Sequence, residues 1–429
     1  MDRPVPSSQL SEILAAIDPA EVSTLAQSLV QIPSVTGHEG LGISRFMANW
    51  LAKNGITSGL QQVGEERANV WGRIDGTRPG PRLLLNGHLD TKPGDTMTID
   101  PFGGDISEGK LWGRGSCDMK GPVACEMIAM KAIAQSGVKL NGTLIFGSEV
   151  GEDGGGWKFQ ELIDGPGACD VGICGEPTDL ELHIGCRGSY PLRIHAIGRA
   201  THTGTAYTGV NAVLKMCTII PALYALPCFQ RSDPIWDRNP INAMIIRGGA
   251  KVSSSVPDEC VVQFDIRLNP DLPPQEVDRL VRAELARLQR EDPELKLEVH
   301  IGREESRSMT VGQAASHIPL DDPLVGDVLA AIEAATGRRP RIAGFPGGCS
   351  TAIMLRRGIR SVIFGPGNLQ QAHSVDEWIA LDQLDQAAKA YASIAYQLPL
   401  FSHPRSESRR HHPTLPCAPD CTAPCLASR

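Results

Sequence analysis

The sequence predicts an α/β protein in which a mostly parallel sheet is flanked by helices and a smaller α+β unit is inserted into the chain. Two observations support this prediction. Short apolar runs alternate with helical patterns over most of the chain, which is typical of a parallel sheet covered by helices. Between about residues 186 and 302, alternating strands replace the buried ones in a β-α-β-β-α-β order, typical of a small ferredoxin-like domain.

The predicted buried strands position the polar residues that follow them. Each is a short apolar run that ends in polar residues, and a helix at 121–137 begins with Gly-Pro and stops at Gly. Parallel sheets of this kind place functional groups just past the carboxyl ends of their strands. The predicted strands are 81–90 (PRLLLNGHLD), 141–150 (NGTLIFGSEV), 168–177 (ACDVGICGEP) and 360–367 (RSVIFGPG).

The inserted unit is predicted from its alternating strands and two amphipathic helices. Its strands are 190–200, 242–250 and 260–270, and its helices are 209–226 and 273–291. We therefore expect four segments: 1–185 and 303–400, which together form a large domain, the inserted domain at 186–302, and a tail at 401–429.

Composition and charge restrict the class of protein. The chain has 429 residues, of which 41% are hydrophobic and 21% are charged, as in globular proteins. The net charge of −8 argues against nucleic-acid binding, which needs a basic face, and favours a small soluble partner. The N-terminal segment has neither a basic region before an apolar run nor a membrane-length span, so we expect a cytoplasmic protein without membrane contact.

Cysteines give two further expectations. The chain has 12 cysteines, and most stand singly in apolar segments, which predicts reduced, buried thiols. The tail at 401–429 has almost no aliphatic residues and is expected to be disordered. It carries a cluster that either binds a metal or forms part of a dispensable tail, although the spacing matches no usual zinc module. The cluster consists of His411, His412, Cys417, Cys421 and Cys425.

Histidines and carboxylates stand in the loops that follow the predicted strands. All are hard oxygen or imidazole ligands in loops punctuated by glycine or proline, and together they are expected at one edge of the sheet. Two histidines with several acids favour zinc, with cobalt or manganese as alternatives, and the excess of acids indicates two ions that share a carboxylate. These residues are His88, Asp90, Asp118, Glu152, Asp153, Glu176 and His373.

The order of these motifs resembles the dinuclear zinc amidohydrolases and exopeptidases, the family of acetylornithine deacetylase, succinyl-diaminopimelate desuccinylase, aminoacylase-1 and carboxypeptidase G. The resemblance spans about residues 25–398. It is carried by LVQIPSVTGHEG, LLLNGHLDTKPGD, LWGRGSCDMKGPVA, the acidic turn, GEPTD, GRATHTG, VPDECVVQFDIRLNP and GPGNLQQAHSVDE.

The resemblance implies a ligand set for two zinc ions. One ion would be held by His88, Asp118 and Glu176, and the other by Asp118, Asp153 and His373, with Asp118 as the bridge. Asp90 would orient the imidazole of His88 through its ring N–H. The resemblance further implies a cis peptide bond between Asp118 and Met119.

The acidic turn FGSEVGEDGGGW has two registers. In the family, a strand begun by Gly-Thr leads to two adjacent acids, a general base and then a metal ligand; counted from Gly142, these are Glu152 and Asp153. The alternative register pairs Glu149 with Val150, which leaves the second zinc short of a ligand, so we reject it. Asp153 stands where the family most often has glutamate, and its shorter side chain implies that the second zinc is displaced or bound less tightly.

The family also implies roles outside the metal site. His202 in GRATHTG matches a lid histidine that reaches the active site of the partner subunit, which implies a homodimer formed through the inserted domain. Without that motif, His202 would be read as an exposed loop histidine. Arg267 matches an arginine that pairs with the substrate carboxylate, with a surface strand cation as the alternative, and Arg187 is a further candidate. Departures from the family fall at three candidate substrate-binding residues: Ser253, Ser254 and Ser350.

Two functions follow as hypotheses. The first is a metal-dependent amidohydrolase that removes the acyl group from a small N-acylated amino acid, with a dipeptidase or glutamate-type carboxypeptidase as its nearest variant. The second is a catalytically silent, zinc-bound dimer that binds a ligand or partner. The presence of Glu152 with a full ligand set favours the enzyme.

Overall fold

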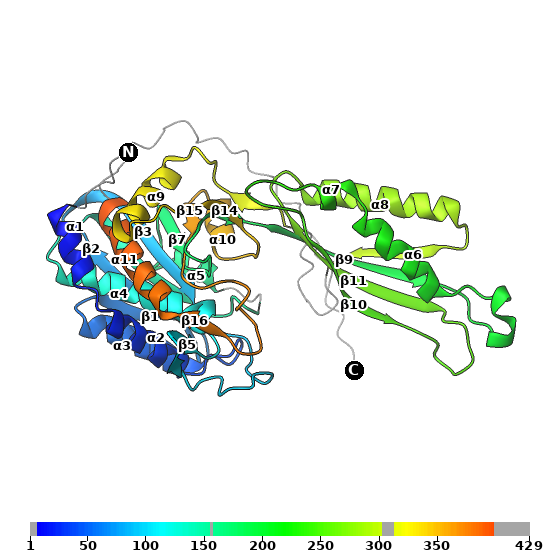
Figure 1. Ribbon diagram of the computed structural model, residues 1–429, viewed down its shortest axis with the longest axis horizontal. Helices are drawn as coiled ribbons and strands as arrows, with labels where there is room; N and C mark the ends of the chain where they lie inside the picture. Colours follow the sequence, from blue (N-terminus) through cyan, green and yellow to red (C-terminus); the bar gives the residue numbers. More distant parts are fainter. Residues whose placement is uncertain (1–6, 155–157, 303–312, 399–429) are drawn as a thin grey trace, which may run out of the picture.

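The computed structural model describes residues 7–154, 158–302 and 313–398. Figure 1 shows a large lobe, in which helices surround a sheet, and an elongated lobe that projects from it. The predicted tail at 401–429, with its cysteine and histidine cluster, lies outside the described residues.

The sheet of the large lobe has nine strands in the described chain, and its centre is parallel. The four central strands, β6, β3, β7 and β15, run in one direction, which confirms the predicted fold class. Both flanks are antiparallel, because β1 and β2 form a hairpin against β6, and β8 runs against β15 and β13. In spatial order the strands are β1 (Thr57–Gly64), β2 (Arg67–Asp75), β6 (Asn141–Glu149), β3 (Arg78–His88), β7 (Val171–Cys174), β15 (Arg360–Ile363), β8 (Leu182–Cys186) and β13 (Ser316–His317), with β14 (Ile342–Phe345) beside β8.

Helices cover both faces of this sheet because its central strands are apolar on both sides. Leu83 and Leu85 of β3 pack into the larger core, whereas Leu84 between them packs into the core on the opposite face. On the larger side lie α1 (Ser8–Ala15), α2 (Pro19–Val30), α3 (Gly40–Lys53), α4 (Gly121–Gln135), α9 (Pro323–Thr336) and α11 (Leu381–Gln397). On the other side lie α5 (Phe159–Ile163) and α10 (Thr351–Arg356).

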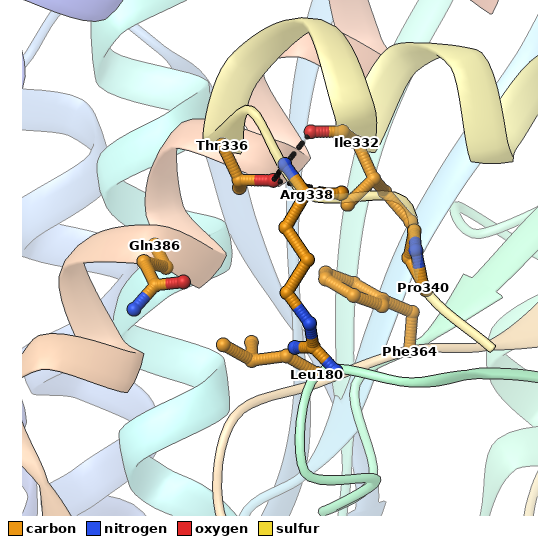
Figure 2. Close-up of a pocket in the computed structure, with 7 residues that line it drawn as sticks. All are labelled: Leu180, Ile332, Thr336, Arg338, Pro340, Phe364 and Gln386. Atoms are coloured by element: carbon orange, nitrogen blue, oxygen red, sulfur yellow. Dashed lines mark hydrogen bonds between the residues drawn. The ribbon is translucent and has the colours of Figure 1, made fainter.

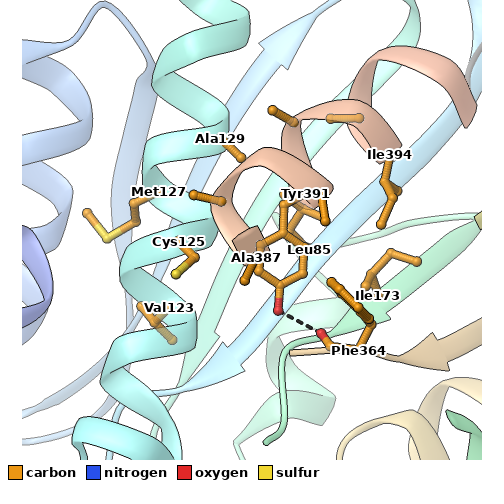
Figure 3. Packing of buried hydrophobic residues seen from close by; sticks show 14 of the residues in the cluster. Leu85, Val123, Cys125, Met127, Ala129, Ile173, Phe364, Ala387, Tyr391 and Ile394 are labelled. Atoms are coloured by element: carbon orange, nitrogen blue, oxygen red, sulfur yellow. Dashed lines mark hydrogen bonds between the residues drawn. The ribbon is translucent and has the colours of Figure 1, made fainter. Parts of the chain in front are cut away.

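Tyr391 of α11 ties the larger core to the strand ends. Its ring packs beside α4 and the central strands, and its hydroxyl donates to the carbonyl of Phe364 at 2.6 Å (Figure 3). Phe364 directly follows β15, so this buried bond fixes the start of the loop that leads to His373.

A small sheet packs at the edge of the large lobe. Its strands are β4 (Ile106–Ser107), β5 (Lys110–Trp112) and β16 (Trp378–Ala380). β16 pairs with β5 and therefore joins the chain that follows His373 to the chain that precedes Asp118.

The projecting lobe is a four-stranded antiparallel sheet with its helices packed on one core. The strand order β10-β11-β9-β12 and the chain order β-α-β-β-α-β are those of the predicted ferredoxin-like unit, with a short 3-10 helix (Thr203–Thr208) and the short helix α7 in addition. The elements are β9 (Gly188–Ile197), α6 (Ala212–Tyr224), α7 (Pro227–Gln230), β10 (Ile241–Gly248), β11 (Glu259–Leu268), α8 (Pro274–Glu291) and β12 (Lys296–Ile301).

Within the described chain, no single helix is both long and apolar enough to cross a membrane. The bent pair α1 and α2 meets the length and composition criteria only when its two helices are taken together.

Candidate active site

The predicted site residues of the large lobe meet at the carboxyl ends of the parallel strands. His88 is the last residue of β3, and it lies opposite Glu149, the last residue of β6. Glu152 and Asp153 follow β6, and Glu176 follows β7 by two residues. Because these strand ends share one edge of the sheet, the loops that leave them converge.

Among the groups that the histidines and carboxylates form, two overlap at Asp118. In each group the candidate ligand atoms all lie within 4.8 Å of one another. The Oδ1 atom of Asp118 lies 3.0 Å from His88 Nε2, and its Oδ2 atom lies 3.2 Å from His373 Nε2. His373 Nε2 also lies 3.1 Å from Asp153 Oδ1. The first group is His88, Asp118 and Glu176, and the second is Asp118, Asp153 and His373.

Asp118 lies in the turn Ser116–Lys120, which leads into α4, and the Asp118–Met119 peptide bond is cis, as the resemblance implied. The turn is held by Glu377, a residue that the sequence reasoning missed. One oxygen of Glu377 accepts from the backbone amides of Cys117 and Asp118, both at 2.9 Å. The other accepts from Arg114 Nη1 at 2.9 Å and from the amide of Gly115 at 3.1 Å. Glu377 lies four residues after His373 in the motif GPGNLQQAHSVDE. An acid so close to a candidate ligand was the sequence signal that could have identified it.

Asp90 differs from its expected role. The Nδ1 atom of His88 bonds to the backbone carbonyl of Asp90 at 2.9 Å, and the nearer carboxylate oxygen lies 3.7 Å away. The Asp90 carboxylate instead accepts from the amides of Glu152 at 3.0 Å and Asp153 at 3.1 Å, and from the Thr36 hydroxyl at 2.8 Å. Asp90 therefore fixes the acidic turn, while its backbone fixes the imidazole.

Burial and mutual repulsion shift the titration of the clustered acids. Burial raises the pKa of Glu152 to about 8, and repulsion by Asp153 and Asp118 adds to this. Burial, together with Asp118 and Glu152, also raises the pKa of Glu176. Burial would raise the pKa of Asp118 too, but hydrogen bonds from His373 and His88 lower it below its ordinary value. Glu152 and Glu176 are thus buried among other carboxylates, and the nearby histidine does not offset burial and the repulsion between the acids.

The donor set fits one or two divalent cations. Five carboxylates, those of Asp90, Asp118, Glu152, Asp153 and Glu176, surround two imidazoles, and Asp153 Oδ2 is buried without a hydrogen-bond partner. Histidine nitrogens with carboxylate oxygens are ligands that zinc accepts, and a backbone carbonyl on the second ring nitrogen is a usual support for a ligating histidine.

Three predicted substrate-binding residues lie outside this cluster. Arg187 and Arg267 stand where the two lobes join, and they are close enough for Arg267 to lower the pKa of Arg187, after burial, which is the larger cause. Arg187 donates to Asn269 at 3.0 Å and to the carbonyl of Trp236, and Arg267 pairs with Asp265 at 3.0 Å. Ser350 is buried, and its hydroxyl donates to Glu149, so it faces the interior and not a substrate.

The remaining predicted residues lie at the far end of the projecting lobe. His202 is bridged to Ser255, and the amide of Thr203 donates to the carbonyl of Ser254 at 2.8 Å, so His202, Ser253 and Ser254 belong to one exposed tip. The ten residues of β9 separate this tip from the large lobe, a span of roughly 30 Å. His202 therefore does not reach the carboxylate cluster of its own chain.

A small crevice of the large lobe is separate from the cluster. It lies between α9, α11 and the segment after β15, and Arg338 crosses it (Figure 2). None of the candidate ligands lines this crevice. Its lining residues are Leu180, Ile332, Thr336, Arg338, Pro340, Phe364 and Gln386.

These features define the class of protein: an α/β protein with a candidate metal centre at the carboxyl edge of its sheet. The chain matches the Peptidase family M20/M25/M40 over residues 84–397, and it belongs to that family. A succinyl-diaminopimelate desuccinylase of Methylobacterium nodulans is 31% identical over 394 residues, which cover 86% of this chain and 94% of the relative. The protein is thus a hydrolase that acts on amide bonds.

Solved structures share the fold. A tripeptidase of Staphylococcus aureus matches with a TM-score of 0.72 at 21% identity, over 89% of this chain and 98% of its own. A dinuclear metal-binding peptidase of Bacillus subtilis, from the same family, matches with a TM-score of 0.63 at 15% identity, over 89% and 98% of the two chains.

Proposed function

We propose that the protein is a metal-dependent amidohydrolase that removes the acyl group from a small N-acylated amino acid. The observation that carries the proposal is the pair of ligand groups that share Asp118, with Glu152 beside both. His88, Asp118 and Glu176 would hold one divalent cation, and Asp118, Asp153 and His373 the other. Zinc is the proposed metal, with cobalt or manganese as alternatives. Bound cations would acidify the attacking water and polarise the scissile carbonyl.

Glu152 is the proposed general base and acid. Its backbone amide is anchored on Asp90, and its carboxylate interacts with the charges of His88, Asp118 and Asp153 although it belongs to neither group. In this role Glu152 accepts the proton of the attacking water and later donates it to the leaving nitrogen. Glu149 is excluded from that role in our proposal because its carboxylate is buried against Ser350 and Asn86.

The substrate class is proposed from the relatives and from two arginines. The relatives cleave a succinylated amino acid by name, and the neighbouring guanidinium groups of Arg187 and Arg267 offer a site for a substrate carboxylate. Both arginines already have partners in this structure, so a carboxylate would share or displace Asn269 and Asp265.

A homodimer is part of the proposal, as is a cytoplasmic location. Five of the nine large apolar side chains exposed in the described chain lie within 207–252 of the projecting lobe, and β10 is an edge strand of its sheet. Paired copies would cover this surface and bring the His202 tip of one subunit toward the other's cluster, where a donor to the tetrahedral oxyanion is needed. The five side chains are Tyr207, Leu214, Met244, Ile246 and Val252.

The test is an assay of chelator-treated and zinc-loaded protein on N-succinyl and N-acetyl amino acids and on dipeptides. We expect zinc-dependent release of the acyl group, and Glu152→Gln should lower turnover by about 10² to 10⁴-fold with zinc retained. Cleavage of dipeptides alone would favour the peptidase variant, and no cleavage by zinc-loaded protein would favour a silent binding protein.

Subunit mixing tests the dimer. His202→Ala should be nearly inactive because loss of an oxyanion donor costs about 10² to 10³-fold. Glu152→Gln should be nearly inactive because it lacks the general base. A mixed dimer has one site that contains both wild-type residues, so mixing the variants should restore part of the activity. Mixtures that stay inactive after subunit exchange, confirmed by mass, would exclude the trans role of His202.

A further inference from the structure

Lys92 makes a direct contact with the second ligand group. Its Nζ atom lies 3.1 Å from Asp153 Oδ1 and donates to the backbone carbonyl of the same residue at 2.5 Å. Two contacts to one residue hold the ammonium group in place, although the lysine side chain is about one third exposed. The oxygen that Lys92 contacts is the one that also lies 3.1 Å from His373 Nε2.

The two ligand groups therefore differ in charge. Within residues 7–154, 158–302 and 313–398, no lysine or arginine forms an ion pair with Asp118 or Glu176 of the first group. In the second group, the Lys92 ammonium already neutralises part of the charge of Asp153. Asp153 Oδ2 is buried without a partner, so the residue keeps one oxygen for a metal ion.

We propose that Lys92 is a built-in competitor of the second metal ion, so that the two metal sites bind with unequal affinity. This inference rests on the proposed function, since it presumes that the two groups bind metal. A divalent cation on Asp153 would be repelled by the ammonium group or would have to displace it. Because lysine has a flexible four-carbon stem, displacement is open to it, and the result is weaker binding and not exclusion.

The size of the effect follows from the charges. A unit charge about 4 Å from a divalent cation changes a binding constant by at least about ten-fold, even at the dielectric constant of water. The first group gains no such penalty from a lysine in contact with it. At low metal concentration the protein would thus carry one ion per chain, held by His88, Asp118 and Glu176, and the second ion would bind only at higher concentration.

The experiment is calorimetric titration of chelator-stripped full-length protein with Co²⁺, with the metal content checked by elemental analysis. Lys92→Met removes the charge and keeps most of the stem, and Lys92→Arg keeps the charge. Lys131→Met is the matched control, since Lys131 is also partly buried and pairs with an acid, Glu21, away from the site. In the wild type we expect one tight site and one weaker site.

In Lys92→Met the second site should tighten by about ten-fold or more and the first by less, and Lys92→Arg and Lys131→Met should resemble the wild type. Two sites in every protein, with equal second affinities in Lys92→Met and the wild type, would overturn the role of Lys92 and leave the metal centre standing. Absence of Co²⁺ binding in the wild type and in Lys92→Met alike would overturn the proposed function together with this inference.

Discussion

Replacing Glu377 by glutamine tests whether the turn that carries Asp118 depends on one buried carboxylate. The Glu377 side chain is 1% exposed and accepts four hydrogen bonds, from Arg114 and from the amides of Gly115, Cys117 and Asp118. In Glu377→Gln the amide oxygen keeps one pair of donors, and the amide NH2 group faces the other pair. Arg114, itself 3% exposed, then loses its counter-ion.

The expected loss of stability is about 3–5 kcal/mol, the cost of removing one partner of a buried ion pair. Two donors left without an acceptor, at about 1–3 kcal/mol each, give a total of similar size. The measurement is the free energy of unfolding from urea denaturation. Glu333→Gln is the matched control, because it breaks an exposed pair with Arg339 and should cost less than about 1 kcal/mol. Equal losses in the two variants would refute the reasoning.

Three further changes give separate tests. Gly344→Ala should cost about 1–3 kcal/mol in urea unfolding, followed by tryptophan fluorescence, because an added Cβ would lie 2.0 Å from the Trp236 ring. Glu149→Gln should lower turnover far less than Glu152→Gln, since Glu149 lies in the buried network and outside both ligand groups; a larger effect of Glu149→Gln in the same steady-state assay would show that the acidic turn was read in the wrong register. His88→Ala should reduce the bound metal by at least one equivalent per chain in elemental analysis, because its Nε2 belongs to the first group.

The sequence was sufficient to bring the strand-end residues together, for a physical reason. Where parallel strands are buried on both faces, their apolar runs stand out, and the first polar residues after each run must emerge at the same edge. His88, Glu152 and Glu176 each follow such a run, and the ladders of β3 with β6 and β7 place them side by side.

Side-chain directions within that edge could not be read in the same way. The Asp90 carboxylate was expected to bind the imidazole of His88, but the backbone carbonyl of Asp90 contacts that ring nitrogen instead. The carboxylate is therefore free to accept from the amides of the acidic turn. Ser350 was expected to face a substrate, yet it lies at the start of α10, where a buried acid from β6 accepts its hydroxyl. Lys92 lies in the motif LLLNGHLDTKPGD, but only the folded structure shows that its ammonium group contacts Asp153.

The antiparallel flank formed by β1 and β2 was not predicted from the sequence, for a different reason. β1 has no buried residue and β2 is buried only in its first part, and neither has a long run of apolar residues, so their pattern is weak beside that of the central strands. They pair with each other and with β6, and they therefore extend the sheet without adding any residue to its functional edge.

The ligand groups and the candidate substrate-binding residues belong to different parts of the molecule, and this separates two kinds of effect. The five candidate metal ligands and Glu152 come from the large lobe, from five segments that only its folded core holds together. Arg267 and His202 come from the projecting lobe, which has a core of its own. A change in the projecting lobe can thus alter the Michaelis constant or turnover while the metal content stays constant. A change at Glu377 or Asp90 reaches the candidate metal ligands through the loops that carry them. Measuring metal content beside turnover for each variant therefore separates activity that is lost with the metal from activity that is lost at a residue outside both ligand groups, such as Glu152 or His202.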